Sequence, residues 1–347
     1  MSQPDWKSQK SKATGSDTAL KYALPIAAFV LLVGGMSLWF ARSNQQPADS
    51  PIVDRAQLPA ANQEQGATSS NAAVTLTPAP ENWRETTHIH GLAVNPVNPA
   101  IAYIATHHGL LQRSETGQWF WMGKQRADYM GFTADPTNPN RFYSSGHPPT
   151  GGNLGFQISH NQGQDWKQIS LPGVDFHALA IAPSNPNIFY GWPASGAQGL
   201  HVSTDGGKTW TQPRMVGLGD AAFSLAVDPQ NSDRVFATTR SGLYESTDSG
   251  NNWTLVPNTQ NAPVVGFTLL KQGNSSVTIG YRVLKSAPGL YRSTDNGKTW
   301  QPLGSGTNGT ILYLAIAPSN PQVLYAVNEN NAVFQSLNGG KTWKELE

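Results

Sequence analysis

Two histidines stand two residues apart in the segment RETTHIHGLAV at 84–94. Its apolar pattern predicts a β-strand, and residues i and i+2 of a strand project to the same side. His88 and His90 therefore present their imidazoles together. Imidazole is a common ligand for zinc, copper and related ions. The segment is thus a candidate metal-binding strand, provided that the fold brings further ligands to it.

The composition narrows the classes of protein to which the chain could belong. The chain has 347 residues, a net charge of +1 and 13% charged residues, with 34 glycines and 25 prolines. Such a composition is typical of a turn-rich β protein, and the absence of a basic excess argues against a nucleic-acid partner. There is no cysteine, which excludes disulfides, thiolate ligands and cysteine nucleophiles.

A short motif repeats from about residue 84 onward. It is clearest as STDGGKTW at 203–210 and returns at 246–253 and 293–300, with looser copies at 114–121, 159–166 and 336–343. The copies end in tryptophans spaced 43–47 residues apart, namely Trp121, Trp166, Trp210, Trp253, Trp300 and Trp343. A strand, an Asn-Pro turn and a second strand precede most copies. Four strands per unit and six units predict an all-β, six-bladed propeller.

The S-x-D-x-G-x-x-W motif resembles the Asp-box of BNR-repeat propellers. These include sialidases, sortilin-type receptors, plant-polysaccharide glycosidases and the photosystem II assembly propeller. The resemblance covers about residues 84–347. In the motif, the aspartate can accept backbone hydrogen bonds, the glycine permits a positive φ and the tryptophan packs beneath the turn. Asp205, Asp248 and Asp295 are accordingly expected to stabilise the fold rather than to catalyse a reaction.

Antiparallel connectivity predicts where the histidines lie. In each blade the first strand starts at the face to which the second strand returns, opposite the Asp-box turn. Aligned on the Asn-Pro turn, the first strands begin with His-x-His, Asp-x-Met and Asp-x-His in blades one to three and with smaller or apolar residues in blades four to six. The candidate metal ligands are His88, His90, His107, His147, Asp175 and His177, with Asp128, Met130 and His108 as a second tier.

This ligand set suits one divalent or cuprous ion, with copper or zinc as the candidates. Two other interpretations stay open. His90, Met130 and His177 occupy a column that is apolar in the other blades, so they could simply pack between blades. The channel mouth could also bind an organic ligand such as a glycan.

Enzymatic activity is a further alternative. Resemblance to sialidases would imply an arginine triad, and Arg126, Arg240 and Arg282 fall near the right face, but the arginine-containing motif and the tyrosine–glutamate pair of that family are missing. A general glycosidase needs two carboxylates. Asp128 and Asp175 are the only pair at the starts of innermost strands, and so are the weak catalytic candidates. The remaining class is a binding or assembly module, as the resemblance to the photosystem assembly propeller implies.

The N-terminal part has a different character. Residues 22–41 form an uncharged apolar run long enough to span a bilayer, at roughly 30 Å as a helix. Lysines precede the run and acidic residues follow it, which predicts a single-pass anchor with a cytoplasmic N-terminus (1–21). A cleaved signal peptide is the alternative. Residues 42–82 are expected to be a flexible linker, within which the segment at 72–78 is a candidate strand to complete the last blade and close the ring. Residues 83–347 are expected to be a periplasmic or extracellular propeller that could hold a membrane-protein partner.

Overall fold

The computed structural model describes residues 74–273 and 275–347. The predicted cytoplasmic segment, the membrane helix and most of the predicted linker lie outside these residues. Across the described ranges, no helix is long and apolar enough to cross a membrane.

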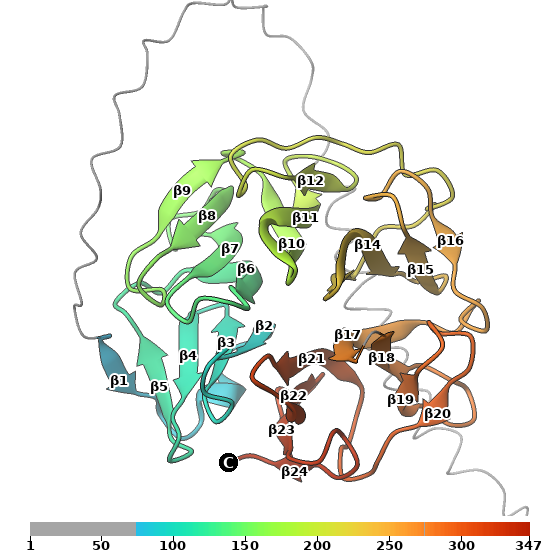
Figure 1. Ribbon diagram of the computed structural model, residues 1–347. Coiled ribbons are helices and arrows are strands. Elements are labelled where there is room, and N and C mark those ends of the chain that lie inside the picture. Colours follow the sequence, from blue (N-terminus) through green and yellow to red (C-terminus); the bar gives the residue numbers. More distant parts are fainter. Residues whose placement is uncertain (1–73, 274) are drawn as a thin grey trace, which may run out of the picture. The chain divides into compact units, whose positions relative to one another are not determined.

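Six antiparallel sheets surround a common centre (Figure 1). The first three blades comprise β2(Ile89–Val94) to β5(Trp119–Met122) with β3(Ala102–Thr106) and β4(Gly109–Arg113), then β6(Asp128–Ala134), β7(Phe142–His147), β8(Phe156–Ser159) and β9(Lys167–Ser170), then β10(Asp175–Ala182), β11(Asn185–Ser195) and β12(His201–Ser203). The last three comprise β13(Ser224–Asp228), β14(Asn231–Thr238), β15(Leu243–Ser246) and β16(Thr254–Leu255), then β17(Val264–Gln272), β18(Ser275–Arg282), β19(Gly289–Ser293) and β20(Gln301–Pro302), then β21(Ile311–Ala317), β22(Asn320–Asn328), β23(Val333–Ser336) and β24(Lys344–Glu345). The prediction of an all-β, six-bladed propeller is confirmed.

The core is divided among the interfaces between blades. Apolar side chains of neighbouring sheets pack against each other, as with Tyr103 and Phe142 between blades one and two and Phe236 and Phe267 between blades four and five. Blade three departs from four strands, because its outer strand is reduced to the bridge between Val202 and Thr211. In all blades, the packing between neighbouring sheets covers both faces of the inner strands and holds them at the channel.

The N-terminal strand differs from expectation. The segment 72–78 was a candidate to complete the last blade, but β1(Leu76–Pro78) pairs with β5 and adds a fifth strand to blade one. The last blade supplies all four of its own strands. The ring closes instead through packing and hydrogen bonds, with Asn331 donating to the carbonyls of Arg84 and Thr87, and Trp119 Nε1 donating to the carbonyl of Glu347.

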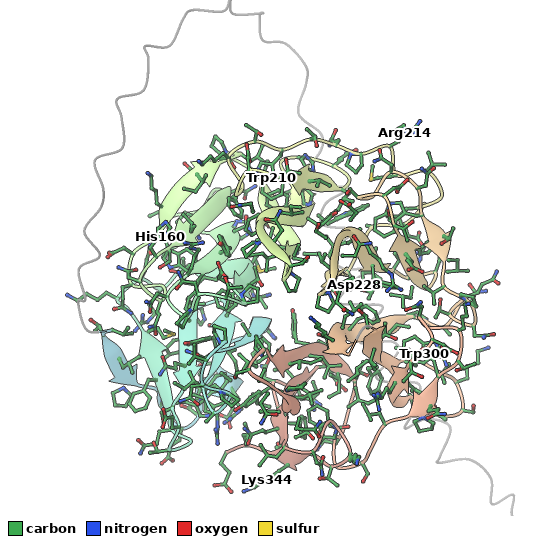
Figure 2. The ribbon with its side chains drawn as sticks, viewed as in Figure 1. His160, Trp210, Arg214, Asp228, Trp300 and Lys344 are labelled. Atoms are coloured by element: carbon green, nitrogen blue, oxygen red, sulfur yellow. The ribbon has the colours of Figure 1, made fainter. Side chains whose placement is uncertain are left out.

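The Asp-box turns connect the third and fourth strands of their blades. In the clearest copy, Asp205 Oδ1 accepts from Thr209 N at 2.9 Å, and Trp210 Nε1 donates to the carbonyl of Gly207 at 3.0 Å. Asp248 and Asp295 accept the same backbone bond from the residue four positions later. Trp210 and Trp300 lie away from the centre of the ring (Figure 2). These contacts fit the structural role that the sequence predicts for the motif.

Candidate metal site at the channel mouth

Strand ends bring the candidate ligands to one face. Asp128, the first residue of β6, pairs with His147, the last residue of β7. Ile89 of β2 pairs with Thr106 at the end of β3, so His88, His90 and His107 lie at that same end. Asp175 begins β10 opposite Ser195 at the end of β11. Blades one to three therefore direct these side chains to one mouth of the channel, as the connectivity predicts.

Glycines let the inner strands approach each other closely. Gly131 has φ +53°, and a Cβ placed there would lie 2.5 Å from the carbonyl oxygen of Phe176 in the next blade. A Cβ at Gly91 would lie 2.9 Å from that of Phe132. Near these positions, each of the inner strands β2, β6 and β10 shifts its register with the strand to which it is hydrogen-bonded. Such bulges re-aim side chains, which here are those of the candidate ligands.

The first cluster joins blades one and two, and we call His90, His107 and Asp128 the first triad. Their ligand atoms all lie within 4.8 Å of one another. His107 Nδ1 donates to Asp128 Oδ2 at 2.7 Å. His90 Nε2 lies 3.8 Å from Asp128 Oδ1, and both atoms are buried without a hydrogen-bond partner in the described residues. The first triad therefore contains a facing pair of unsatisfied polar atoms.

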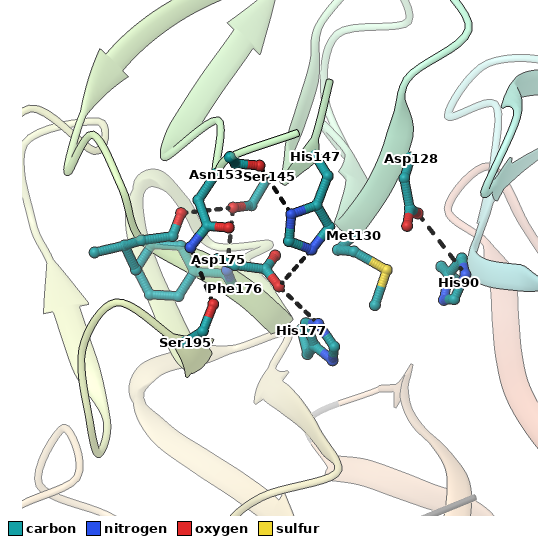
Figure 3. A network of polar contacts seen from close by, with 12 residues as sticks. His90, Asp128, Met130, Ser145, His147, Asn153, Asp175, Phe176, His177 and Ser195 are labelled. Atoms are coloured by element: carbon teal, nitrogen blue, oxygen red, sulfur yellow. Dashed lines mark hydrogen bonds and ion pairs between the residues drawn. The ribbon is translucent and has the colours of Figure 1, made fainter. Parts of the chain in front are cut away.

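The second cluster joins blades two and three, and we call His147, Asp175 and His177 the second triad. His177 Nε2 and His147 Nε2 both approach Asp175 Oδ2, at 2.7 and 3.1 Å, and this carboxylate is 2% exposed. His147 Nδ1 also contacts the carbonyl oxygen of Gly152 at 2.9 Å. Since a carbonyl and a carboxylate only accept, His147 donates from both nitrogens. Figure 3 shows the second triad together with His90 and Asp128 of the first, with Met130 between them.

The two triads differ in charge. Burial lowers the pKa of His90 to about 3, an effect that the nearby Asp128 only partly offsets. The hydrogen bond to Asp175 raises the pKa of His147 to about 9 against the opposing effect of burial. Burial would raise the pKa of Asp175, but its bonds to the two histidines outweigh this and lower it to about 2. At neutral pH the first triad thus has a neutral His90, whereas the second contains an ion pair between the partly exposed His147 and the buried Asp175.

A cavity of about 750 Å³ lies within the channel, next to the two triads. His90 and His177 line it together with mostly apolar side chains of the inner strands, such as Leu92, Phe132 and Phe267. The two imidazoles thus lie on one side of a passage whose lining is mostly apolar but also includes polar side chains such as Ser224 and Thr268. A small ligand or ion that enters from this mouth meets the imidazoles.

Other predicted ligands lie at the edges. His88 is exposed and its ring centroid lies 5.6 Å from that of His107, while His108 is exposed and belongs to neither triad. Met130 is 7% exposed on β6. The predicted metal ligands are therefore divided between two clusters. Asp128, a second-tier candidate in the sequence, is a member of the first triad.

Some residues at the mouth were not anticipated. Asn153 donates to the carbonyl of Gly173 and to Ser195 Oγ, and thereby fixes the 148–155 loop. Tyr313 of the last blade lines the channel, where burial and then the nearby Asp128 raise its pKa to about 12. The long glycine-rich loop was a signal for the first. No signal pointed to Tyr313, since its column holds small residues in most of the other blades.

The residues considered for catalysis each interact with neighbouring side chains. Asp128 and Asp175 each pair with histidines. Arg126 lies over the ring of Trp121, Arg240 is exposed near Asp220, and Arg282 lies over the rings of Tyr291 and Trp300. These three arginines therefore have separate local contacts on blades one, four and five.

Comparison with known proteins places the repeats among Asp-box propellers. The family model described as photosynthesis system II assembly factor YCF48 matches residues 158–317, less than half of the chain. A probable oligoxyloglucan-reducing end-specific xyloglucanase of Neosartorya fischeri is 26% identical over 195 residues, which cover 49% of this chain and 24% of that protein. The chain thus spans about a quarter of the length of the curated relative that it matches.

Solved structures share the fold. The GH74 enzyme of Niastella koreensis superposes with a TM-score of 0.55 at 20% identity, over 75% of this chain and 45% of that one. A structure of YCF48 bound to D1 peptide gives a TM-score of 0.46 at 16% identity, over 80% and 86% of the two chains. The six blades, their motifs, the family-model match and the superposition on the GH74 enzyme together define a β-propeller of the BNR type. Within that class, its repeats are similar to those of YCF48 assembly factors and of xyloglucanases.

Proposed function

We propose that this chain is a binding or assembly module whose channel mouth holds one metal ion, either divalent or cuprous. The observation that carries the metal proposal is the facing pair in the first triad. Leaving a buried polar atom without a partner costs about 1–3 kcal/mol. A cation between His90 Nε2 and Asp128 Oδ1 would satisfy both atoms at once.

The donor set fits the ion. Imidazole and carboxylate ligands lie about 2.0–2.2 Å from zinc, so two ligand atoms of a tetrahedral site are separated by about 3.4 Å. The 3.8 Å between His90 Nε2 and Asp128 Oδ1 needs only a small contraction. His107, which donates to the other oxygen of Asp128, would orient that carboxylate.

The assembly role is supported by the match of residues 158–317 to the assembly factor family. We further propose that residues 22–41 anchor the chain, with the propeller on the periplasmic or extracellular side and a membrane protein as its partner. Four lysines ahead of the apolar run support this orientation. Protease added to spheroplasts should digest the propeller or its linker, and protection of the whole chain would contradict the orientation.

Metal content tests the proposed site. The full-length chain, purified in detergent without chelators, should retain close to one equivalent of copper or zinc by mass spectrometry. A chain in which His90 and Asp128 are replaced by Gln and Asn should retain none while keeping its circular dichroism spectrum. Equal metal content in the two proteins, or none in either after incubation with copper or zinc, would overturn the proposal.

Glycoside hydrolysis is the second candidate, favoured by the 26% identity to the xyloglucanase. A glycosidase acid needs a raised pKa and access to the sugar. Asp175 instead has a lowered pKa and is buried between two histidines. Incubation with xyloglucan oligosaccharides tests this candidate, and release of reducing sugar that is lost in Asp128→Asn would establish it over the binding module.

A further inference from the structure

The two triads differ in what their ligand atoms still have available. In the second triad both nitrogens of His147 donate hydrogen bonds, one to Gly152 and one to Asp175. His177 uses the same oxygen of Asp175. A metal bound there would have to displace bonds that already satisfy the nitrogens facing the carboxylate. The second triad is therefore better suited to holding the loop than to holding an ion.

The second triad leaves only Asp175 Oδ1 buried without a partner in the described residues, whereas the first triad leaves two such atoms, one on each of two residues. His90 Nε2 and Asp128 Oδ1 face each other across 3.8 Å, and each is buried without a hydrogen bond in the described part of the chain. His107, which is bonded to the other oxygen of Asp128, is 40% exposed, so the first triad reaches the surface at the channel mouth through this side chain. An ion can thus reach this place without unfolding a blade.

Met130 lies on the same strand as Asp128 and brings a sulfur atom to this end of β6. Met130 follows Asp128 by two residues on β6, so their side chains leave the same face of the strand apart from the local bulge. The side chain is 7% exposed, and it extends toward Asp128 and His90 (Figure 3). A thioether is a soft ligand that suits cuprous copper. Zinc sites in proteins are instead built from cysteine, histidine and carboxylate ligands.

We infer that the first triad, with the sulfur of Met130, binds cuprous copper in preference to zinc. The inference rests on the proposed metal site and names its ion. His90 supplies the imidazole, Met130 supplies the soft ligand, and Asp128 with His107 supplies the charge and the orientation.

Competition against a chromophoric chelator tests the preference. The full-length chain in detergent is titrated anaerobically with Cu(I) in the presence of bicinchoninate, and separately with Zn(II) in the presence of a zinc-specific dye. Met130→Leu should weaken Cu(I) binding by about tenfold or more, the scale on which groups around a metal alter its affinity. The same substitution should change the affinity for Zn(II) less than twofold.

Two control substitutions distinguish the loss of a metal ligand from a general change in packing. Met122→Leu changes another buried methionine, on β5, the fourth strand from the channel, and should leave both affinities unchanged. His147→Gln should also leave Cu(I) affinity unchanged, whereas His90→Gln should lower it. If His147→Gln lowers Cu(I) affinity as much as His90→Gln does, the ion belongs to the second triad and the inference is wrong.

X-ray absorption gives a readout that needs no variant. The Cu(I)-loaded wild-type chain should show a sulfur scatterer in the first coordination shell. A shell of nitrogen and oxygen alone, with zinc bound as tightly as copper, would overturn the inference and leave the proposed metal site intact. Failure of the wild-type chain to bind either ion would instead overturn the proposed function itself.

Discussion

His90 Nε2 faces Asp128 Oδ1 across 3.8 Å, and neither atom has a hydrogen-bond partner within the described residues. The two residues come from adjacent blades and meet where β2 and β6 begin. A neutral imidazole and a carboxylate oxygen placed in this way attract a cation more readily than they attract each other.

Removing the charge of Asp128 should weaken metal binding. Asp128→Asn keeps an oxygen that can accept from His107 but lowers the attraction for a cation, so we expect at least about a tenfold loss of affinity. The measurement is titration of the full-length chain with Cu(I) and Zn(II). Asp220→Asn, at the corresponding mouth of blade four, is the matched control and should have no effect. Equal affinities of the Asp128 variant and the wild type would argue against the site.

Gly131 should be essential for the approach of blades two and three. An alanine there would need φ +53° and would place its Cβ 2.5 Å from the carbonyl oxygen of Phe176. We expect a loss of at least about 2 kcal/mol in the free energy of unfolding, measured by urea denaturation. Gly151→Ala has a similar φ but open space around its Cβ, so it should cost only about 1 kcal/mol. Equal losses would mean that the close approach is unimportant.

His147 should fix the 148–155 loop. His147→Ala removes the bonds to Gly152 and to the buried Asp175, so we expect about 1–3 kcal/mol of destabilisation and faster hydrogen exchange in the loop. His160→Ala is the control, because His160 is exposed in the Asp-box region of the same blade. Unchanged exchange in the loop of the His147 variant would show that other contacts, such as those of Asn153, suffice.

The Asp-boxes should make stability depend on acid pH. Hydrogen bonds from Thr209 and Thr299 lower the pKa values of Asp205 and Asp295 to about 2. A carboxylate whose pKa is lowered by folding stabilises the fold above its ordinary pKa near 4, and that contribution is lost as the pH falls through about 2. Unfolding free energies should therefore fall between pH 4 and pH 2.

Asparagine offers a test of that dependence. Asn161 and Asn338 already occupy the aspartate position in two blades and accept the same backbone bond. Asp205→Asn should thus keep most stability at pH 7 but reduce the slope of stability between pH 4 and pH 2. An unchanged slope would assign the acid sensitivity to other carboxylates.

The sequence predicted the architecture well because the propeller repeats its signals. Six tryptophans at regular spacing specify six blades, and antiparallel connectivity alone places His90 and His147 at one mouth. It failed for residues 72–78, because a short strand carries no mark of the edge with which it pairs. The division of the ligands into two triads could not be predicted either. It depends on how closely Gly91 and Gly131 let neighbouring strands approach, and spacing along a chain does not encode distances between blades.

Anomalous diffraction would locate a copper ion bound at the channel mouth. Crystals of the chain grown with Cu(I) under anaerobic conditions, measured on both sides of the copper absorption edge, locate the ion without any assumption about its ligands. We expect one strong peak between His90 Nε2 and Asp128 Oδ1, within bonding distance of Met130. A chain that binds copper but shows its peak elsewhere, or crystals with no peak at this mouth, would contradict the account.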